Sequence, residues 1–250
     1  MAATQLTYVY GVRKPTSAKI SSTGIGGAKL RQIESDGVAA LVSDLPSPNV
    51  QFGREELTAH ARVLEQALEQ GTVLPMRFGV VLDSPEDVQA RVLDAYRDEL
   101  QRQLEQFEGK VELRLRAIYD EEQVMREIVT EDQEIARLRE LVRREPEEAT
   151  YFERIRLGEL VAAAIERKRE QDSDQVLRTL EPRAHAVVLG ATTHERMVFS
   201  ASFLVDRDRL AEFDKAVDEV GRQQADRMRL KYTGPLPPHS FAELTTAAEA

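Results

Sequence analysis

The stretch Gly71-Thr-Val-Leu-Pro-Met-Arg-Phe-Gly-Val-Val-Leu82 decides how the first half of this 250-residue chain folds. It is apolar, contains several β-branched residues and is followed by the turn-forming Asp83-Ser84-Pro85, so it predicts a buried strand. Pro75 cannot donate a hydrogen bond within a sheet, and it is therefore expected at an edge, a strand end or a bulge.

Arg77 is the only charged residue of this stretch. A buried guanidinium needs partners, so one interpretation pairs Arg77 with a nearby carboxylate that stabilises the fold. The other places Arg77 against a partner or an anion. The two differ in what Arg77→Ala does. Loss of a buried pair lowers the free energy of unfolding by about 3–5 kcal/mol, whereas loss of an exposed contact lowers only binding.

The residues around this stretch predict more strands and two helices. Asp36-Gly37 is a hairpin signal, and Ser84 followed by Pro85 marks a helix start. Strands are expected over residues 6–12, 29–34, 38–43 and 111–119, and helices over 55–70 and 84–107. This order is typical of a sheet with helices on one face, a variant of the ferredoxin-like class. It predicts an N-terminal ferredoxin-like domain over residues 1–120.

The second half alternates differently. Apolar residues at helical spacing predict helices over residues 121–144, 157–180 and 209–222, and alternating residues predict strands over 184–189, 197–205 and 228–232. Residues 121–250 are therefore expected to form a second domain in which helices pack on a small, mainly antiparallel sheet. The fold class of the whole chain is α+β.

No motif of the sequence indicates catalysis or a cofactor. The chain has no cysteine, and its four histidines lack the spacing of metal ligands. His60 lies at the border of an apolar helical stripe and is expected to be a boundary residue. Gly24-Ile-Gly-Gly-Ala28 lacks the full spacing and the Lys-Ser/Thr pair of a phosphate loop, so a connector is expected there. This pattern favours an interaction protein over an enzyme.

Composition and charge argue against nucleic acid as a partner and against a membrane-spanning helix. The net charge of −10 argues against unspecific nucleic-acid binding, which needs a basic surface. A membrane-spanning helix needs about 20 apolar residues in a row, and none is present. The N-terminus lacks the pattern of a secretory signal, and the absence of cysteine agrees with a cytoplasmic location.

Three longer segments carry a resemblance that covers nearly the whole chain in order. Val73–Leu82, Gly109–Leu115 and Leu230–Phe241, together with the aromatic start Tyr8–Val12, are similar to the gas vesicle protein family GvpL/GvpF. The resemblance implies a non-enzymatic accessory protein of gas vesicles that binds the small hydrophobic shell subunit and other accessory proteins. Candidate contact residues on its motifs are Arg77, Phe78, Gly79, Tyr232, Gly234 and Pro235.

Two alternatives stay open at this point. The protein could be a minor structural component of the vesicle wall, or a regulator that binds a small molecule in the crevice between its domains. The resemblance implies a location at the gas vesicle, within the cytoplasm. No cofactor, metal or nucleotide is expected.

Overall fold

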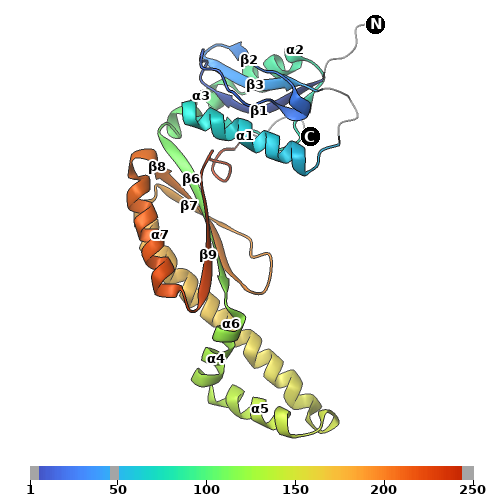
Figure 1. Cartoon of the computed structure of the whole chain (residues 1–250), viewed down its shortest axis with the longest axis vertical. Helices are drawn as coiled ribbons and strands as arrows, with labels where there is room; N and C mark the ends of the chain where they lie inside the picture. Colours follow the sequence, from blue (N-terminus) through green and yellow to red (C-terminus); the bar gives the residue numbers. More distant parts are fainter. Residues whose placement is uncertain (1–5, 46–50, 244–250) are drawn as a thin grey trace. The chain divides into compact units, whose positions relative to one another are not determined.

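The computed structural model describes residues 6–45 and 51–243 and divides the chain into two units that are discontinuous in sequence (Figure 1). The first unit contains the chain up to Glu112, the short segment Asp206–Asp208 and the chain from Gly234 onward. The second contains Leu113–Val205 and Arg209–Thr233. Both units combine helices with antiparallel strands, so the predicted α+β class is confirmed.

The first unit is built on a sheet with the order β2-β3-β1-β4, and β5 also pairs with β1. The predicted hairpin joins β2 and β3. Asp36 and Gly37 both have positive φ, at 40° and 85°, as the central residues of a tight hairpin turn require. The strands are β1 (Thr7–Arg13), β2 (Leu30–Ser35), β3 (Val38–Asp44), β4 (Val73–Pro75) and β5 (Val81–Leu82). The finer name ferredoxin-like stays a prediction.

Three helices complete this unit. They are α1 (Arg54–Gln70), α2 (Pro85–Val88) and α3 (Arg97–Gln106), with a wide π turn over Gln89–Asp94. α1 packs closely on β1, because a Cβ at Gly11 would lie 3.1 Å from Leu64 of α1. The predicted helix start is confirmed: Ser84 accepts a hydrogen bond from the backbone of Asp87 at 3.1 Å, with Pro85 as the first helical residue.

The second unit has a sheet of four strands in the order β7-β8-β6-β9. These are β6 (Lys110–Tyr119), β7 (Ala186–Gly190), β8 (Met197–Asp206) and β9 (Met228–Leu236). The predicted first domain includes the strand at 111–119, but β6 lies inside the second sheet, between β8 and β9. The chain from Gly234 onward also returns to the first unit. The observed division therefore differs from a cut at residue 120.

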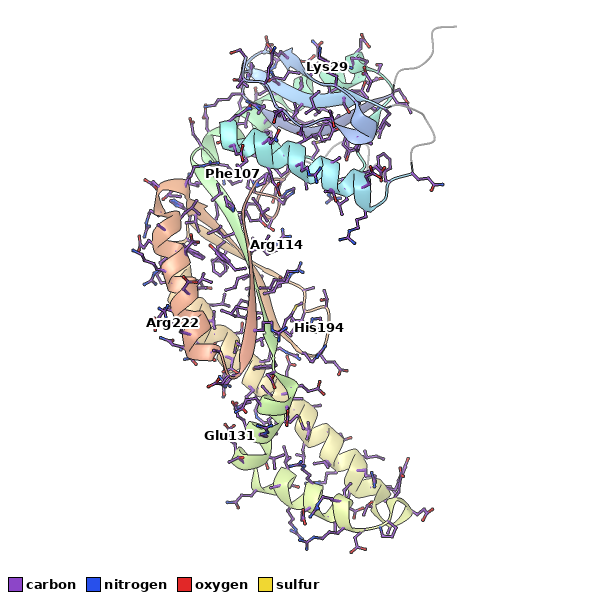
Figure 2. The ribbon with its side chains drawn as sticks, in the orientation of Figure 1. Lys29, Phe107, Arg114, Glu131, His194 and Arg222 are labelled. Atoms are coloured by element: carbon purple, nitrogen blue, oxygen red, sulfur yellow. The ribbon has the colours of Figure 1, made fainter. Side chains whose placement is uncertain are left out.

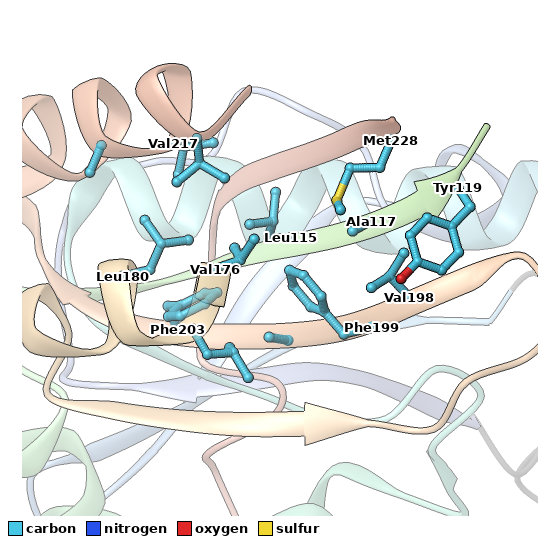
Figure 3. Packing of buried hydrophobic residues seen from close by; sticks show 14 of the residues in the cluster. Leu115, Ala117, Tyr119, Val176, Leu180, Val198, Phe199, Phe203, Val217 and Met228 are labelled. Atoms are coloured by element: carbon cyan, nitrogen blue, oxygen red, sulfur yellow. The ribbon is translucent and has the colours of Figure 1, made fainter. Parts of the chain in front are cut away.

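Helices cover this sheet and extend beyond it (Figure 1). α6 (Tyr151–Leu180) and α7 (Leu210–Gln224) pack on the sheet, and α4 (Glu121–Glu131) and α5 (Gln133–Arg144) run back along α6. Figure 3 shows the core, where Phe199 and Phe203 of β8 lie among Leu115, Leu180 and Val217. The predicted helix over 121–144 is two helices, because the Asp132 carboxylate accepts hydrogen bonds from the backbone of Glu134 and Ile135.

A largely buried ion network joins α4, α6 and the residue before β9. The Arg227 guanidinium binds Glu127 at 2.8 and 3.0 Å and Asp172 at 2.9 and 2.8 Å. Lys168 also contacts Glu127 at 3.1 Å, and the Tyr119 hydroxyl donates to Asp172 at 2.7 Å. Burial alone raises the pKa of Glu127, but Arg227 and Lys168 outweigh it and leave that pKa below its usual value. Arg227 is thus a bidentate structural arginine.

The helices of residues 6–45 and 51–243 are all too short or too polar to cross a lipid bilayer.

Candidate functional site

Three residues bulge out of the strand that pairs with β1. Pro75 pairs with Gly11 and Val81 pairs with Tyr8, so residues 76–80 face only residues 9 and 10 of β1. The backbone amides of Met76 and Val9 close the two ends, donating to Tyr10 at 2.9 Å and to Val80 at 3.1 Å. The excess residues Arg77, Phe78 and Gly79 form a bulge, and Gly79 has a φ of 93° that favours glycine.

This bulge corrects the prediction of one continuous strand over residues 71–82. Arg77 is exposed, so its interpretation as a buried structural arginine is wrong. The physical reason is local, because the bulge lifts Arg77 out of the sheet. Pro75 ends β4 directly before the bulge, in a strand at the edge of the sheet, as its missing amide hydrogen requires.

A buried hydrogen-bond network supports the bulge. The Gly79 amide donates to the Tyr8 hydroxyl at 3.0 Å, and the Tyr8 hydroxyl lies 2.9 Å from Nδ1 of His60. The backbone of Met76 also hydrogen-bonds the His60 ring. His60 is only 4% exposed, and burial, together with the nearby His239, lowers its pKa to about 4. Neutral His60 therefore connects α1 to both ends of the bulge.

Aromatic rings gather above this network. The Phe78 ring meets the rings of His60 and Phe52 edge-on, with centroids 5.7 and 5.5 Å apart, and Tyr10 stacks on His60 at 5.6 Å. Phe52 is 40% exposed and Phe78 is half-buried. We call Phe52, Arg77 and Phe78 the aromatic patch. It offers apolar edges and a cation on a fixed base, an arrangement suited to recognition of another protein.

His60 and Tyr8 carry no signal in the sequence that marks this role. His60 was expected to be a boundary residue, but it is buried and hydrogen-bonded to Tyr8 and to the backbone of Met76. Burial raises the pKa of Tyr8 well above its usual value. Because Tyr8 and the backbone of Met76 both hold the His60 ring, this residue positions the bulge.

The other predicted contact residues lie elsewhere. Tyr232 belongs to the second unit, where its hydroxyl donates to Asp214 at 2.7 Å and its ring stacks on Phe213 at 6.5 Å. Gly234 and Pro235 are exposed in the closing segment, residues 234–243, and Gly234 has a φ of 146°, which a Cβ would penalise. The six predicted residues are therefore divided between two units.

The closing segment is anchored to the first unit by polar side chains. Ser240 donates through its backbone amide and its hydroxyl to Glu112, at 2.6 and 2.8 Å. Gln103 and the backbone of Glu243 exchange two hydrogen bonds of 2.9 and 3.1 Å. Glu112 is fully buried, so these bonds satisfy a carboxylate that has left water. The segment also brings His239 to His60.

The described residues 6–45 and 51–243 hold no group of three or more His, Asp or Glu that could bind a metal ion.

Removing the Tyr8 hydroxyl tests the support of the bulge. Tyr8→Phe leaves the Gly79 amide without its acceptor and Nδ1 of His60 without its donor. We expect the free energy of unfolding to fall by about 1–3 kcal/mol, measured by urea denaturation. Tyr151→Phe, which removes the hydroxyl of an exposed tyrosine, is the matched control and should change little. Equal stability of the Tyr8 variant and the wild type would contradict the network.

Comparison with known proteins identifies relatives over the whole length. The family model described as "Gas vesicle synthesis protein GvpL/GvpF" matches residues 6–243. Gas vesicle protein F of Streptomyces sp. (strain CB03234) is 35% identical over 242 residues, which cover 95% of this chain and 99% of that protein. Gas vesicle protein L1 of Halobacterium salinarum is 25% identical over 256 residues, covering 94% of this chain and 89% of that protein.

Two solved structures share the fold. The crystal structure of GvpF from Anabaena sp. PCC7120 superposes with a TM-score of 0.85 at 23% identity, covering 96% of this chain and 99% of that one. GvpF from Microcystis aeruginosa gives a TM-score of 0.81 at 24% identity, covering 96% of this chain and 100% of that one.

Proposed function

This chain belongs to the GvpL/GvpF family of gas vesicle synthesis proteins, and from that membership we propose that it is a non-enzymatic accessory protein of gas vesicle formation. In this proposal it binds the small hydrophobic shell subunit at the gas vesicle, together with other accessory proteins, and assists assembly of the shell.

The observation that carries the proposal is the aromatic patch of the first unit. Phe52 and Phe78 are in edge-on contact, Arg77 directly precedes Phe78 in the bulge, and the buried Tyr8–His60 network supports that bulge. Aromatic and arginine side chains on a rigid base are typical of residues that dominate binding energy at protein interfaces. The first unit is therefore our proposed contact region for the shell subunit.

The physical need for such a protein follows from the shell itself. A subunit that faces gas on one side exposes apolar surface before assembly, and exposed apolar surface favours unproductive association. An accessory protein with a net charge of −10 resists self-association. Covering the apolar surface of the subunit at the aromatic patch would keep the subunit available for assembly.

The edge strand β7 is a competing contact region in the second unit. Ala186–Gly190 contains no charged residue, and Val188 and Leu189 are 39% and 60% exposed. An exposed, uncharged edge strand can accept a strand from another protein. The two regions predict different effects of mutation, so one binding experiment separates them.

We expect Arg77→Ala and Phe52→Ser, in the full chain, to weaken binding of the purified shell subunit about tenfold each, the equivalent of about 1.4 kcal/mol. Both side chains are exposed or partly exposed, so the melting temperature should stay near that of the wild type. Leu189→Ser is the matched variant on β7, and Phe152→Ser controls for loss of an exposed aromatic residue elsewhere. The shell subunit would be immobilised on a sensor surface and titrated with each variant, and the melting temperature of each variant would be measured.

Two results would count against this location. If Leu189→Ser lost binding and Arg77→Ala kept it, strand addition at β7 would replace the aromatic patch as the contact region. If the wild-type chain did not bind the shell subunit at all, the proposed function would be wrong.

A further inference from the structure

A basic pocket opens on the first unit, on the side of β1 and β2 that faces the loop of residues 14–23. Its volume is about 540 Å³, within the range of small-molecule sites. The lining includes Arg13, Lys19, Lys29 and Arg31 but no aspartate or glutamate. Such a local excess of positive charge stands out in a chain with a net charge of −10. Lys29 is labelled in Figure 2.

Arg13 is the central feature of this pocket. It is only 4% exposed, and its guanidinium donates to the side-chain oxygen of Gln70 at 3.1 Å. Gln70 is neutral, and within the described residues no carboxylate pairs with Arg13. Burial lowers the pKa of Arg13. A buried cation without an anion is costly, in contrast to Arg227, which two carboxylates neutralise.

Other groups of the pocket can contribute to binding an anion. Lys19 and Lys29 are exposed at its rim, and neither forms an ion pair within the part of the chain that the structure describes. The buried Ser22 hydroxyl has no hydrogen-bond partner there. Arg31 differs, because it already pairs with Asp44 at 2.5 Å. The groups left for a ligand are the Arg13 guanidinium, which already donates one bond to Gln70, two ammonium groups and the Ser22 hydroxyl. One acceptor, the buried side-chain oxygen of Gln32, also lines the pocket and has no hydrogen-bond partner among the described residues.

We propose that this pocket binds a small anion that carries a phosphate group, with Arg13 at its base and Lys19 and Lys29 at its rim. A guanidinium binds two phosphate oxygens at once, ammonium groups add charge, and a hydroxyl donates to a third oxygen. The pocket is a concave site of small-molecule size, which favours a small ligand over a protein surface. Of the glycines in Gly24–Ala28, Gly27 lines this pocket. The proposed site therefore depends on the basic side chains and not on a phosphate-loop motif.

The test uses the full chain and two probes, inorganic phosphate and ATP. Binding to the folded state must raise the melting temperature in a concentration-dependent way. We expect phosphate or ATP at millimolar concentration to do so, relative to sodium chloride at the same ionic strength. A response to ATP that exceeds the response to phosphate assigns the site to a phosphorylated small molecule, and equal responses assign it to free phosphate. Both results support the proposal.

Variants connect the effect to the pocket. Arg13→Met should abolish the response and, without ligand, should melt at the wild-type temperature or above it, because it removes an unneutralised buried charge. Lys29→Ala should weaken the apparent affinity about tenfold. Lys215→Ala removes an exposed lysine of the second unit and is the matched control.

Three results would overturn the proposal. The first is the absence of any response of the wild type to phosphate and to ATP in melting and calorimetric titration. The second is a response that Arg13→Met and Lys29→Ala leave unchanged. The third is binding of an acidic peptide, tested as poly-glutamate, where phosphate and ATP do not bind, which would make the pocket a protein-docking site.

Discussion

Replacing Arg227 by alanine should lower the free energy of unfolding by about 3–5 kcal/mol. The guanidinium binds Glu127 and Asp172 with two hydrogen bonds each, and these carboxylates come from different helices. Alanine would leave both carboxylates partly buried with less positive charge beside them, although Lys168 would still contact Glu127. Loss of a partner from a largely buried pair is costly because the remaining charge is only partly hydrated.

The controls for this prediction lie close by. Arg227→Lys keeps the charge but cannot bind both carboxylates through two nitrogens each, so we expect an intermediate loss. Arg222→Ala breaks the exposed pair with Glu219 and should change the free energy of unfolding little (Figure 2). Chemical denaturation of the three variants gives the comparison. Arg227→Ala within 1 kcal/mol of the wild type would show that the network adds little to stability.

Acidification should destabilise the first unit through His60. Its pKa is about 4 in the folded protein, because the ring is buried and near His239, and about 6.5 in an unfolded chain. Between these values the unfolded state binds the proton and the folded state does not. The contribution of neutral His60 is therefore complete above pH about 6.5 and is lost as the pH falls towards about 4, by about 3 kcal/mol in total.

The structure also gives the reason at the atomic level. Protonation of His60 would put an N–H at Nδ1, facing the Tyr8 hydroxyl. The oxygen of that hydroxyl already accepts a hydrogen bond from the Gly79 amide. His60→Gln removes the titration, so its unfolding free energy should depend less on pH over this window. His194→Gln, which changes an exposed histidine, should follow the wild-type profile (Figure 2). Parallel profiles for the wild type and His60→Gln would contradict the assignment.

Local signals predicted many elements of the fold but few of its long-range contacts. Asp36-Gly37 and Ser84-Pro85 act within a few residues, so the hairpin and the helix start could be read directly. The strand at 111–119 was also predicted, but its partners β8 and β9 come about 80 residues or more later in the chain. Alternation says that a strand has a buried face and does not say which sheet it joins.

The arginines show that the sequence does not predict which charged side chains are buried. Arg77 lies in an apolar stretch and was considered for burial, yet three excess residues lift it to the surface. Arg13 ends β1 and Arg227 directly precedes β9, and both bind elements distant in sequence. His60 is similar, since its partners Tyr8 and Met76 come from two other segments. Burial of these polar side chains depends on tertiary packing that period and composition do not encode.

The most direct test of the proposed function is a cross-linking measurement at the bulge. A photo-reactive amino acid would replace Arg77 in the full chain, and in a second protein it would replace Phe152, an exposed aromatic residue of the second unit. Each protein would be irradiated with the purified shell subunit, and the products separated by mass. The proposal predicts a covalent product with the shell subunit from position 77 and little from position 152. A product from position 152 and none from position 77 would contradict it.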